Sequence, residues 1–383
     1  MKASAARGYG AEWRENWPMT LAAMLGYSAI GLQSYAFGPF VSSLEQEFGW
    51  TRTEAMIGVS VSNAVGVFIN ILSGMLVDRL GPRRVGLTGL FVKTGAFALL
   101  ATATGTLLNW SLLWGLLAVG VVMLQAPIWT KSVAAKFDHS RGFAMAVVLS
   151  GTPITAMVAP VLGTWLIESY GWRTAFVGVA GFWLLASFPL AFLFYRDPLP
   201  PASDAAGLTR ELDGYTFREG IRTRAFFCLL ISFGAFSFYN MAIATNLVPL
   251  LAETGISKMQ AAGIAATMGI VGMVARLTVG FLMDRMAGNV VGMISQLLPV
   301  IGCAILLSGA NDAMMLTLAV ATFGIATGAE VDAALYLATR HFGLKAFAAL
   351  FGAVITFGAV MAAIGPFVAG SLHDRTGNYD GLL

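Results

Sequence analysis

Four ionisable residues lie inside long apolar stretches of the sequence, where an isolated charge is unfavourable. They are Lys93, Arg276, Glu330 and Asp332. A charge at the centre of a membrane helix costs roughly 2.5–3.5 kcal/mol on insertion scales, so such side chains face one another or a water-filled path. These residue types therefore favour a path for a polar solute or an ion.

Arg276 supplies a positive charge that burial cannot neutralise, and it therefore needs an anion. A spacing of 206 residues pairs it with Asn70, so two equivalent stretches carry a polar group at the same depth. We expect Arg276 and Asn70 to contact substrate. The alternative is a structural salt bridge from Arg276 to the stretch that holds Glu330 and Asp332.

Glu330 and Asp332 are two residues apart, so on a helix they point about 200° from one another. We expect one of them to carry a proton, and a purely structural pair is the alternative. Lys93 lies about eight residues, or roughly 12 Å, from the nearer end of its helix. Its four-carbon stem can reach part of the way to water, and we favour that interpretation over a place on the substrate path.

Composition indicates an all-α integral membrane protein. Hydrophobic residues make up 57% of the chain and charged residues 11%, against about 45–50% and 25% in soluble domains. The net charge of +3 gives no reason to expect nucleic acid as a partner. The two cysteines and three histidines show no ligand spacing, so we expect no metal, no cofactor and no enzyme chemistry.

The apolar stretches predict eleven membrane spans in two groups. A polar segment over 196–224 separates an N-terminal half, 1–195, from a C-terminal half, 225–383. The predicted spans are 17–40, 53–77, 85–106, 109–133, 142–168, 172–195, 225–251, 259–283, 289–309, 313–338 and 346–370.

The two halves are copies of one unit. The run that begins at Gly74 and ends in Asp78-Arg79 returns 206 residues later, from Gly280 to Asp284-Arg285. A helix-capping box precedes each copy at the same spacing, formed by Thr51 with Glu54 and by Ser257 with Gln260. A complete duplication would have twelve spans, so the twelfth helix is missing, either because the chain is truncated or because the helix has been lost.

Positive charge predicts the orientation. Most of the 23 lysines and arginines fall in the N-terminal segment, the central linker and every second loop. The opposite loops hold only Arg52, Arg173, Lys258 and Arg375. We therefore place the N-terminus and the linker in the cytoplasm of a multi-pass protein of the cytoplasmic (inner) membrane.

The loop Gly74–Arg84, with its pattern Gly-x-Leu-x-Asp-Arg-x-Gly-x-Arg-Arg, resembles the signature of the major facilitator superfamily of secondary transporters. Four shorter runs resemble the bacterial branch of monocarboxylate porters and oxalate/formate antiporters. They are Glu47-Phe48-Gly49-Trp50, Arg141-Gly142-Phe143-Ala144, Gly171-Trp172-Arg173-Thr174-Ala175-Phe176 and Arg340-His341-Phe342-Gly343. The resemblance implies two six-helix halves that alternate in their access to the two sides.

The resemblance also implies roles for particular residues. Met273-Val274-Ala275-Arg276 resembles the stretch in which porters of this branch bind the substrate carboxylate, although the aspartate they often carry one turn earlier is Gly272 here. The cavity of the superfamily is lined mainly by the first, fourth, seventh and tenth helices, which here carry Gln33, Tyr239, Asn240, Asn246 and Tyr336. The gating residues implied by the loop and its second copy are Asp78, Arg79, Arg83, Asp284 and Arg285.

The resulting hypothesis is a monomeric secondary transporter of a small organic anion, similar to a monocarboxylate and moved with protons. Two alternatives stay open at this point. One is a transporter of a neutral or drug-like solute, in which Arg276 is structural. The other is a membrane scaffold or inactive fragment that transports nothing.

Overall fold

The computed structural model describes residues 9–137, 140–197, 215–283, 288–309, 311–342 and 347–383. Within these ranges the description does not extend to the side chains of residues 9, 11, 70–78, 280–283, 288–289, 332, 336, 339–340 and 347–348.

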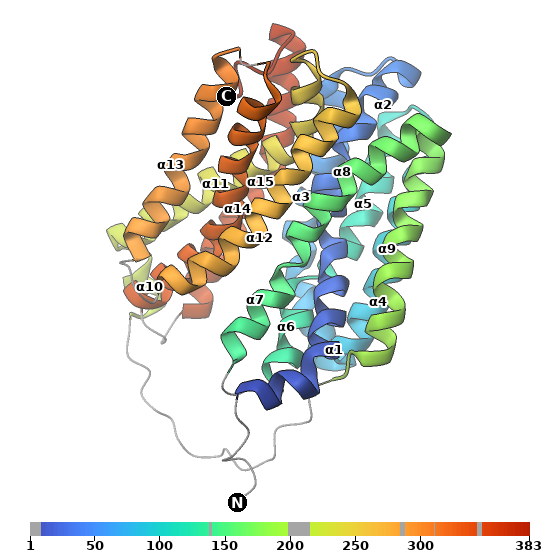
Figure 1. The fold of residues 1–383 in the computed structure, drawn as a ribbon. Coiled ribbons are helices and arrows are strands. Elements are labelled where there is room, and N and C mark those ends of the chain that lie inside the picture. The colour runs from blue at the N-terminus through green and yellow to red at the C-terminus, as the bar shows by residue number, and fades with distance from the viewer. Residues whose placement is uncertain (1–8, 138–139, 198–214, 284–287, 310, 343–346) are drawn as a thin grey trace, which may run out of the picture.

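Helices form the whole architecture of the described residues (Figure 1). The N-terminal half contains α1 (Tyr9–Ser28), η1 (Ala29–Gly31), η2 (Leu32–Ala36), η3 (Gly38–Phe40), α2 (Val41–Phe48), α3 (Arg52–Leu80), α4 (Pro82–Leu99), η4 (Leu100–Thr102), α5 (Leu107–Val122), α6 (Ala126–Ala134), α7 (Arg141–Leu149), α8 (Gly151–Tyr170) and α9 (Trp172–Phe194). The short helix α10 (Phe217–Gly220) lies within the linker predicted over 196–224. The C-terminal half contains α11 (Arg224–Ala252), α12 (Lys258–Met283), α13 (Gly288–Leu307), α14 (Ala313–Phe342) and α15 (Phe347–Thr376).

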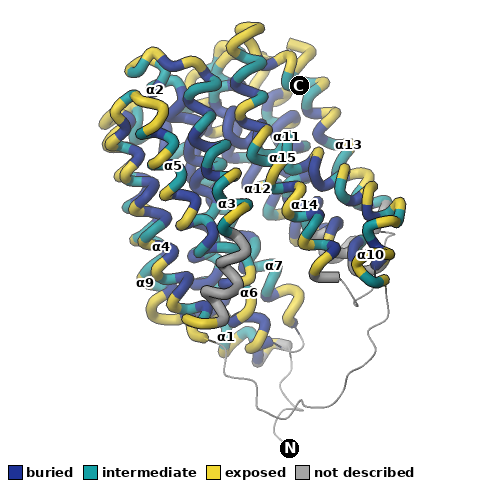
Figure 2. The backbone as a smooth tube through the Cα atoms, turned by 180° about the vertical axis from the view of Figure 1, so that it is seen from behind, coloured by how far each residue is buried: buried dark blue, intermediate teal, exposed yellow. Residues whose placement is uncertain are grey.

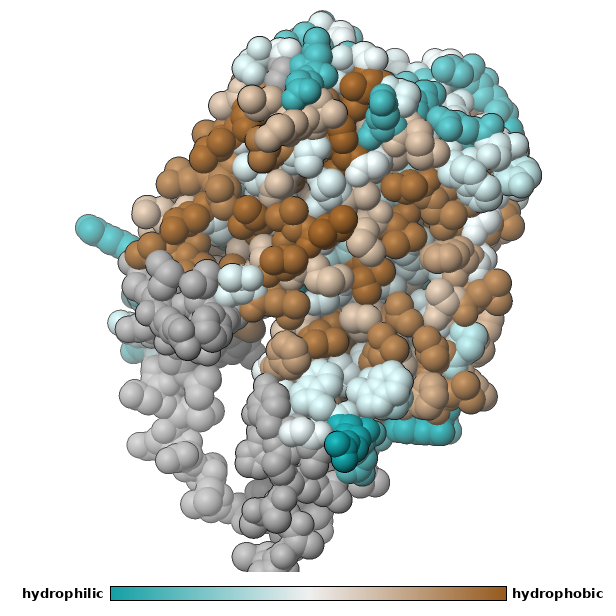
Figure 3. Space-filling view, viewed as in Figure 1, coloured by the Kyte–Doolittle hydropathy of each residue, from teal (hydrophilic) through white to brown (hydrophobic). Residues whose placement is uncertain are grey.

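The helices suit a lipid environment. Among the described residues, nine helical segments are long and apolar enough to cross a membrane, and α1 with η1–η3 and α3 fill the two remaining predicted positions. Large apolar side chains such as Leu112, Leu185 and Ile231 are exposed on the outside. Figure 3 shows an apolar band around the middle of one face, with hydrophilic residues gathered at the end that carries α2. We call this end the α2 end, and the opposite one, where α9 ends and α11 begins, the linker end.

The two halves touch through two related helix pairs. α3 packs against α15, and α8 packs against α12. In the 206-residue repeat α12 is the counterpart of α3, and α15 is the counterpart of α8, so the two contacts are the same contact made twice. Figures 1 and 2 show the halves side by side at the α2 end, with their ribbons separating towards the linker end.

Both predicted capping boxes are present. The Thr51 N–H donates to Glu54 at 2.8 Å and the Glu54 N–H donates to Thr51 at 3.2 Å. Ser257 and Gln260 exchange the same two bonds at 3.1 and 3.2 Å. These bonds satisfy amide groups that the first turn of a helix leaves unpaired, which fixes where α3 and α12 begin.

The first crossing is irregular in its middle. Between α1 and α2 the backbone passes through a 3-10 turn, a π-helical turn at Leu32–Ala36 and another 3-10 turn. Two glycines permit close contacts here: a Cβ on Gly31 would lie 2.9 Å from Thr155 of α8, and one on Gly38 would lie 2.9 Å from the Thr245 carbonyl of α11. Irregular turns of this kind inside helices are frequent at functional sites.

Candidate functional site

Arg276 lies where the two halves meet. Its side chain is buried on α12, and its Nη1 donates a 2.7 Å hydrogen bond to the carbonyl oxygen of Leu149. Leu149 is the last residue of α7, at the break before α8. Tyr35 in the π-helical turn η2 packs against buried apolar clusters of both halves. A fixed positive charge on the C-terminal half therefore contacts the break between α7 and α8 of the N-terminal half.

Lys93 does not reach water, so the interpretation that its stem extends towards the helix end is wrong. The side chain is completely buried, and its Nζ donates a 3.3 Å hydrogen bond to Oε1 of Gln33. The same oxygen accepts a 3.2 Å bond from Ser62, and Nε2 of Gln33 donates to Asn63 at 3.4 Å. α4 packs between α5 and α9. Because of this packing, the side chain of Lys93 points towards η2 and α3 and away from the lipid.

Glu330 is held by neutral groups on two neighbouring helices. Its carboxylate accepts hydrogen bonds from Ser295 at 2.8 Å, from Gln296 at 2.7 Å and from Ser232 at 3.4 Å. The side chain is 4% exposed and borders a cavity of about 240 Å³ between α11, α13 and α14. Because these partners carry no charge, Glu330 can gain or lose a proton without breaking an ion pair with any of them.

A network at the α2 end joins the halves, and sequence reasoning missed it. Arg52 of α3 binds Glu45 and donates a 2.6 Å hydrogen bond to Tyr379, which donates to Asn246 of α11 at 2.9 Å. Asp374 of α15 accepts the backbone N–H groups of Arg52 and Thr53, each at 2.9 Å. We call these residues the α2-end network. The signal available in the sequence was that the first turn of α3 needs acceptors.

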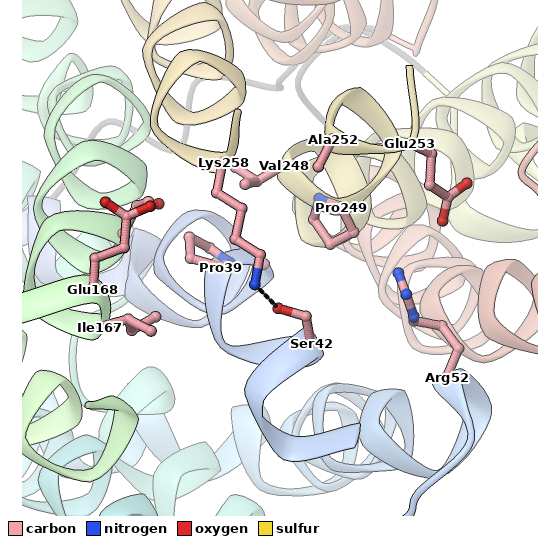
Figure 4. A pocket seen from close by; sticks show the side chains of 12 residues that line it. Pro39, Ser42, Arg52, Ile167, Glu168, Val248, Pro249, Ala252, Glu253 and Lys258 are labelled. Atoms are coloured by element: carbon pink, nitrogen blue, oxygen red, sulfur yellow. Dashed lines mark hydrogen bonds between the residues drawn. The ribbon is translucent and has the colours of Figure 1, made fainter. Parts of the chain in front are cut away.

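A cavity of about 220 Å³ lies beside this network, between the halves (Figure 4). Lys258 projects into it and donates a 3.0 Å hydrogen bond to Ser42 across the boundary between the halves. Glu168 and Glu253 line opposite sides of the same cavity. Charges of both signs therefore surround this outer space.

The other predicted substrate residues spread over several places. Gln33 belongs to the Lys93 cluster, and Asn246 belongs to the α2-end network. Asn240 donates a 2.6 Å hydrogen bond to Thr327, which links α11 to α14. Tyr239 lines a separate cavity of about 370 Å³ beside α13. The side chains of Asn70, Tyr336 and Asp332 lie outside the described residues.

Of the predicted gating residues, Arg83 and Arg79 are described. Arg83 donates a 2.7 Å hydrogen bond to the carbonyl of Phe192, and its backbone N–H donates to Asp197 at 2.8 Å, so it ties α4 to the end of α9. Arg79 is exposed at the linker end. Asp78, Asp284 and Arg285 lie outside the described side chains. Among described residues, no group of three or more histidine, cysteine or acidic side chains could hold a metal ion.

Two helical halves that meet through repeat-related contacts agree with the sequence comparison, in which residues 23–366 match the Major Facilitator Superfamily. The chain belongs to the major facilitator superfamily. Members of this family are transporters and not enzymes.

Curated relatives of this superfamily member include monocarboxylate transporters. The chain is 26% identical over 347 residues to monocarboxylate transporter 13 of Rattus norvegicus, covering 90% of this chain and 78% of the relative. It is 26% identical over 358 residues to monocarboxylate transporter 12 of the same organism, covering 85% and 70%. An uncharacterized MFS-type transporter of Escherichia coli (strain K12), YhjX, is 24% identical over 307 residues, covering 78% and 72%.

Solved structures show the same fold. A bacterial homolog of the human lysosomal transporter Spinster, in an inward-facing and unoccupied conformation, gives a TM-score of 0.75 at 17% identity, over 96% of this chain and 84% of that chain. The nucleoside transporter NupG gives 0.74 at 14% identity, over 95% and 94%. At these identities the likeness concerns the fold alone.

Proposed function

We propose that this major facilitator moves a small organic anion, similar to a monocarboxylate, across the cytoplasmic membrane by alternating access and with protons. The observation that carries the proposal is the position of Arg276. Its guanidinium group is permanently charged, buried at the boundary between the halves and hydrogen-bonded at the break between α7 and α8. Such a group recognises a carboxylate through two parallel N–H bonds, which a lysine cannot reproduce.

The relatives support the same substrate class. The curated relatives include two transporters named for monocarboxylates, and each covers most of this chain. The bond from Arg276 to Leu149 favours the competing proposal, in which the arginine is structural and the solute is neutral. In an anion transporter, the carboxylate competes with this carbonyl oxygen for the guanidinium group.

The contacts between the halves support a state that is closed at the α2 end. The α2-end network and the bond from Lys258 to Ser42 join the halves there. With positive charge assigning the linker end to the cytoplasm, this state faces inward. Glu330, or Asp332 two residues later, supplies a carboxyl group for the coupled proton.

The test is uptake into proteoliposomes, with and without an inward proton gradient. The probes are labelled lactate, pyruvate, formate and oxalate, with uridine and glucose as neutral probes. We expect at least one carboxylate to accumulate, and a protonophore to abolish the accumulation. Arg276→Gln should reduce carboxylate uptake at least tenfold, and Arg276→Lys should weaken it less, because lysine keeps the charge and loses the fork geometry.

Arg222→Gln is the matched control, because Arg222 is an exposed arginine at the linker end. It should leave uptake unchanged. Carboxylate uptake at the wild-type level by Arg276→Gln would make the arginine structural. Accumulation of uridine or glucose alone would assign a neutral substrate, and transport of none of the probes would remove the proposal.

A further inference from the structure

Lys93 is a completely buried ionisable side chain, and the transport proposal gives it no role. It is 0% exposed, and the described structure gives it one hydrogen-bond partner, the neutral amide oxygen of Gln33. A buried ammonium group without an anion is unfavourable in a medium of low dielectric constant. Lysine, unlike arginine, escapes that penalty by releasing its proton.

The surroundings of Lys93 supply no counter-charge. The elements packed against α4 are α9, α5, α6, α3, η4, η1 and α1, and Lys93 also contacts η2 through Gln33. Among their described residues, those that carry a charge lie towards helix ends, and the two tyrosines are neutral hydroxyl groups. These residues are Arg173, Lys131, Arg52, Glu54, Arg79, Glu12, Arg14, Glu15, Tyr27 and Tyr35. In the part of the chain that the structure describes, none of these groups forms a hydrogen bond or an ion pair with Lys93, whose partner is Gln33.

The cluster around Lys93 is short of acceptors. Gln33 Oε1 already accepts from Ser62 as well as from Lys93. Asn63 accepts from Gln33, and its own Nδ2 is buried without a hydrogen-bond partner in the described structure. A neutral amine adds a lone pair to such a cluster, whereas an ammonium group adds only another donor. Without a bound anion, the cluster therefore favours the neutral form of Lys93.

Gln33, which accepts the hydrogen bond from Lys93, lies in the π-helical turn η2. This turn also reaches the boundary between the halves. Gln33, Ser34 and Tyr35 are consecutive residues of η2. Ser34 contacts Met241 of α11, and Tyr35 packs against buried apolar clusters of both halves. The five-residue turn that supplies the acceptor of Lys93 therefore also contacts the half that carries Arg276.

We propose that Lys93 binds and releases a proton during transport, as a site in the N-terminal half that is separate from Glu330. This inference rests on the proposed function, because the anion supplies the coupling. A carboxylate that neutralises the charge of Arg276 lowers the electrostatic penalty for adding a second positive charge in the same low-dielectric region. Anion and proton then bind cooperatively, which is the linkage that a symporter needs.

The first experiment needs no substrate. Wild type, Lys93→Met and the control Lys136→Met, which removes an exposed lysine, are unfolded thermally in detergent between pH 7 and 10. If Lys93 is neutral in the folded protein and protonated when unfolded, the unfolded state binds more protons, so stability rises with pH towards about 10. The folding equilibrium of wild type relative to Lys93→Met should rise by up to tenfold per pH unit. An equal pH dependence in the two proteins would overturn the proposal.

The second experiment measures protons taken up when lactate, pyruvate, formate or oxalate is added to purified protein in weakly buffered dye solution. Wild type and Lys136→Met should take up protons with whichever acid binds, and Lys93→Met should take up about one proton fewer per bound acid while still binding the acid. Binding by wild type without proton uptake would overturn the proposal even if the Lys93 variant fails to fold. If no acid binds, the proposed function fails, and the pH dependence of stability still decides the role of Lys93.

Discussion

At the scale of single residues, buried and exposed charges are stabilised differently in this protein. Lys93 and Glu330 stand inside the halves with neutral partners, so each can change its protonation state without losing an ion pair with those partners. Glu47 stands outside the spans and pairs with Arg173 of α9. Hydrogen bonds from Arg173 and then from Trp172 hold the pKa of Glu47 below its usual value.

Glu47→Gln should destabilise the protein slightly at neutral pH, by at most about 1 kcal/mol, because exposed ion pairs contribute little. A lowered pKa in the folded state means that this contribution is present above the ordinary glutamate pKa and is lost as the pH falls through the folded value. Thermal unfolding in detergent between pH 7 and 3 measures it, with the exposed carboxylate variant Glu168→Gln as control. A difference between wild type and Glu47→Gln that persists at pH 3 would contradict this account.

At the scale of elements, small residues set how closely the helices of opposite halves approach. A Cβ on Gly269 of α12 would lie 2.3 Å from the Pro153 carbonyl and 2.5 Å from the Met157 amide nitrogen of α8. Both are backbone atoms, which cannot move aside without separating the helices. On the same helix, a Cβ on Gly263 would meet nothing within 4 Å. The contact between α8 and α12 therefore requires glycine at position 269, whereas position 263 has room for a larger side chain.

Gly269→Ala should push α8 and α12 apart and destabilise the folded protein by roughly 1–3 kcal/mol, the usual range for overpacking. Gly263→Ala adds the same methyl group to the same helix and should be neutral or slightly stabilising. Unfolding temperatures of the two variants in the same detergent decide the matter. Equal temperatures for both would show that the α8–α12 contact is looser than these distances indicate.

At the scale of the whole molecule, the α2-end network closes one side. Asp374 caps the first amide groups of α3 from the opposite half, and Gly370 allows this approach because a Cβ there would lie 2.8 Å from the Thr53 Cα. Any state that opens the α2 end must separate α3 from α15 and break these bonds. The hydrogen bonds to Asp374 therefore stabilise the state that is closed at the α2 end.

Asp374→Ala should remove about 0.5–2 kcal/mol of this preference, the usual value of a helix cap. That corresponds to a shift of roughly twofold to thirtyfold towards states open at the α2 end. Distances between spin labels at Tyr170 and Ser308, exposed residues of opposite halves, should broaden to longer values. Asp380→Ala, at the same end, should leave the distances unchanged, and an unaltered distribution in Asp374→Ala would remove Asp374 from the closure.

Apolar composition, repeat spacing and capping patterns were sufficient to predict the all-helical membrane fold, because a chain in lipid must satisfy its backbone internally. Sequence alone also predicted where α3 and α12 begin, since a capping box acts within four residues. The sequence did not predict the hydrogen-bond partners that ionisable side chains find on distant parts of the chain. The partner of Lys93 is 60 residues away and the partner of Asp374 is about 320 residues away, and helix rotation and packing decide such pairs. Only the tertiary structure could place Lys93 against Gln33 instead of towards water.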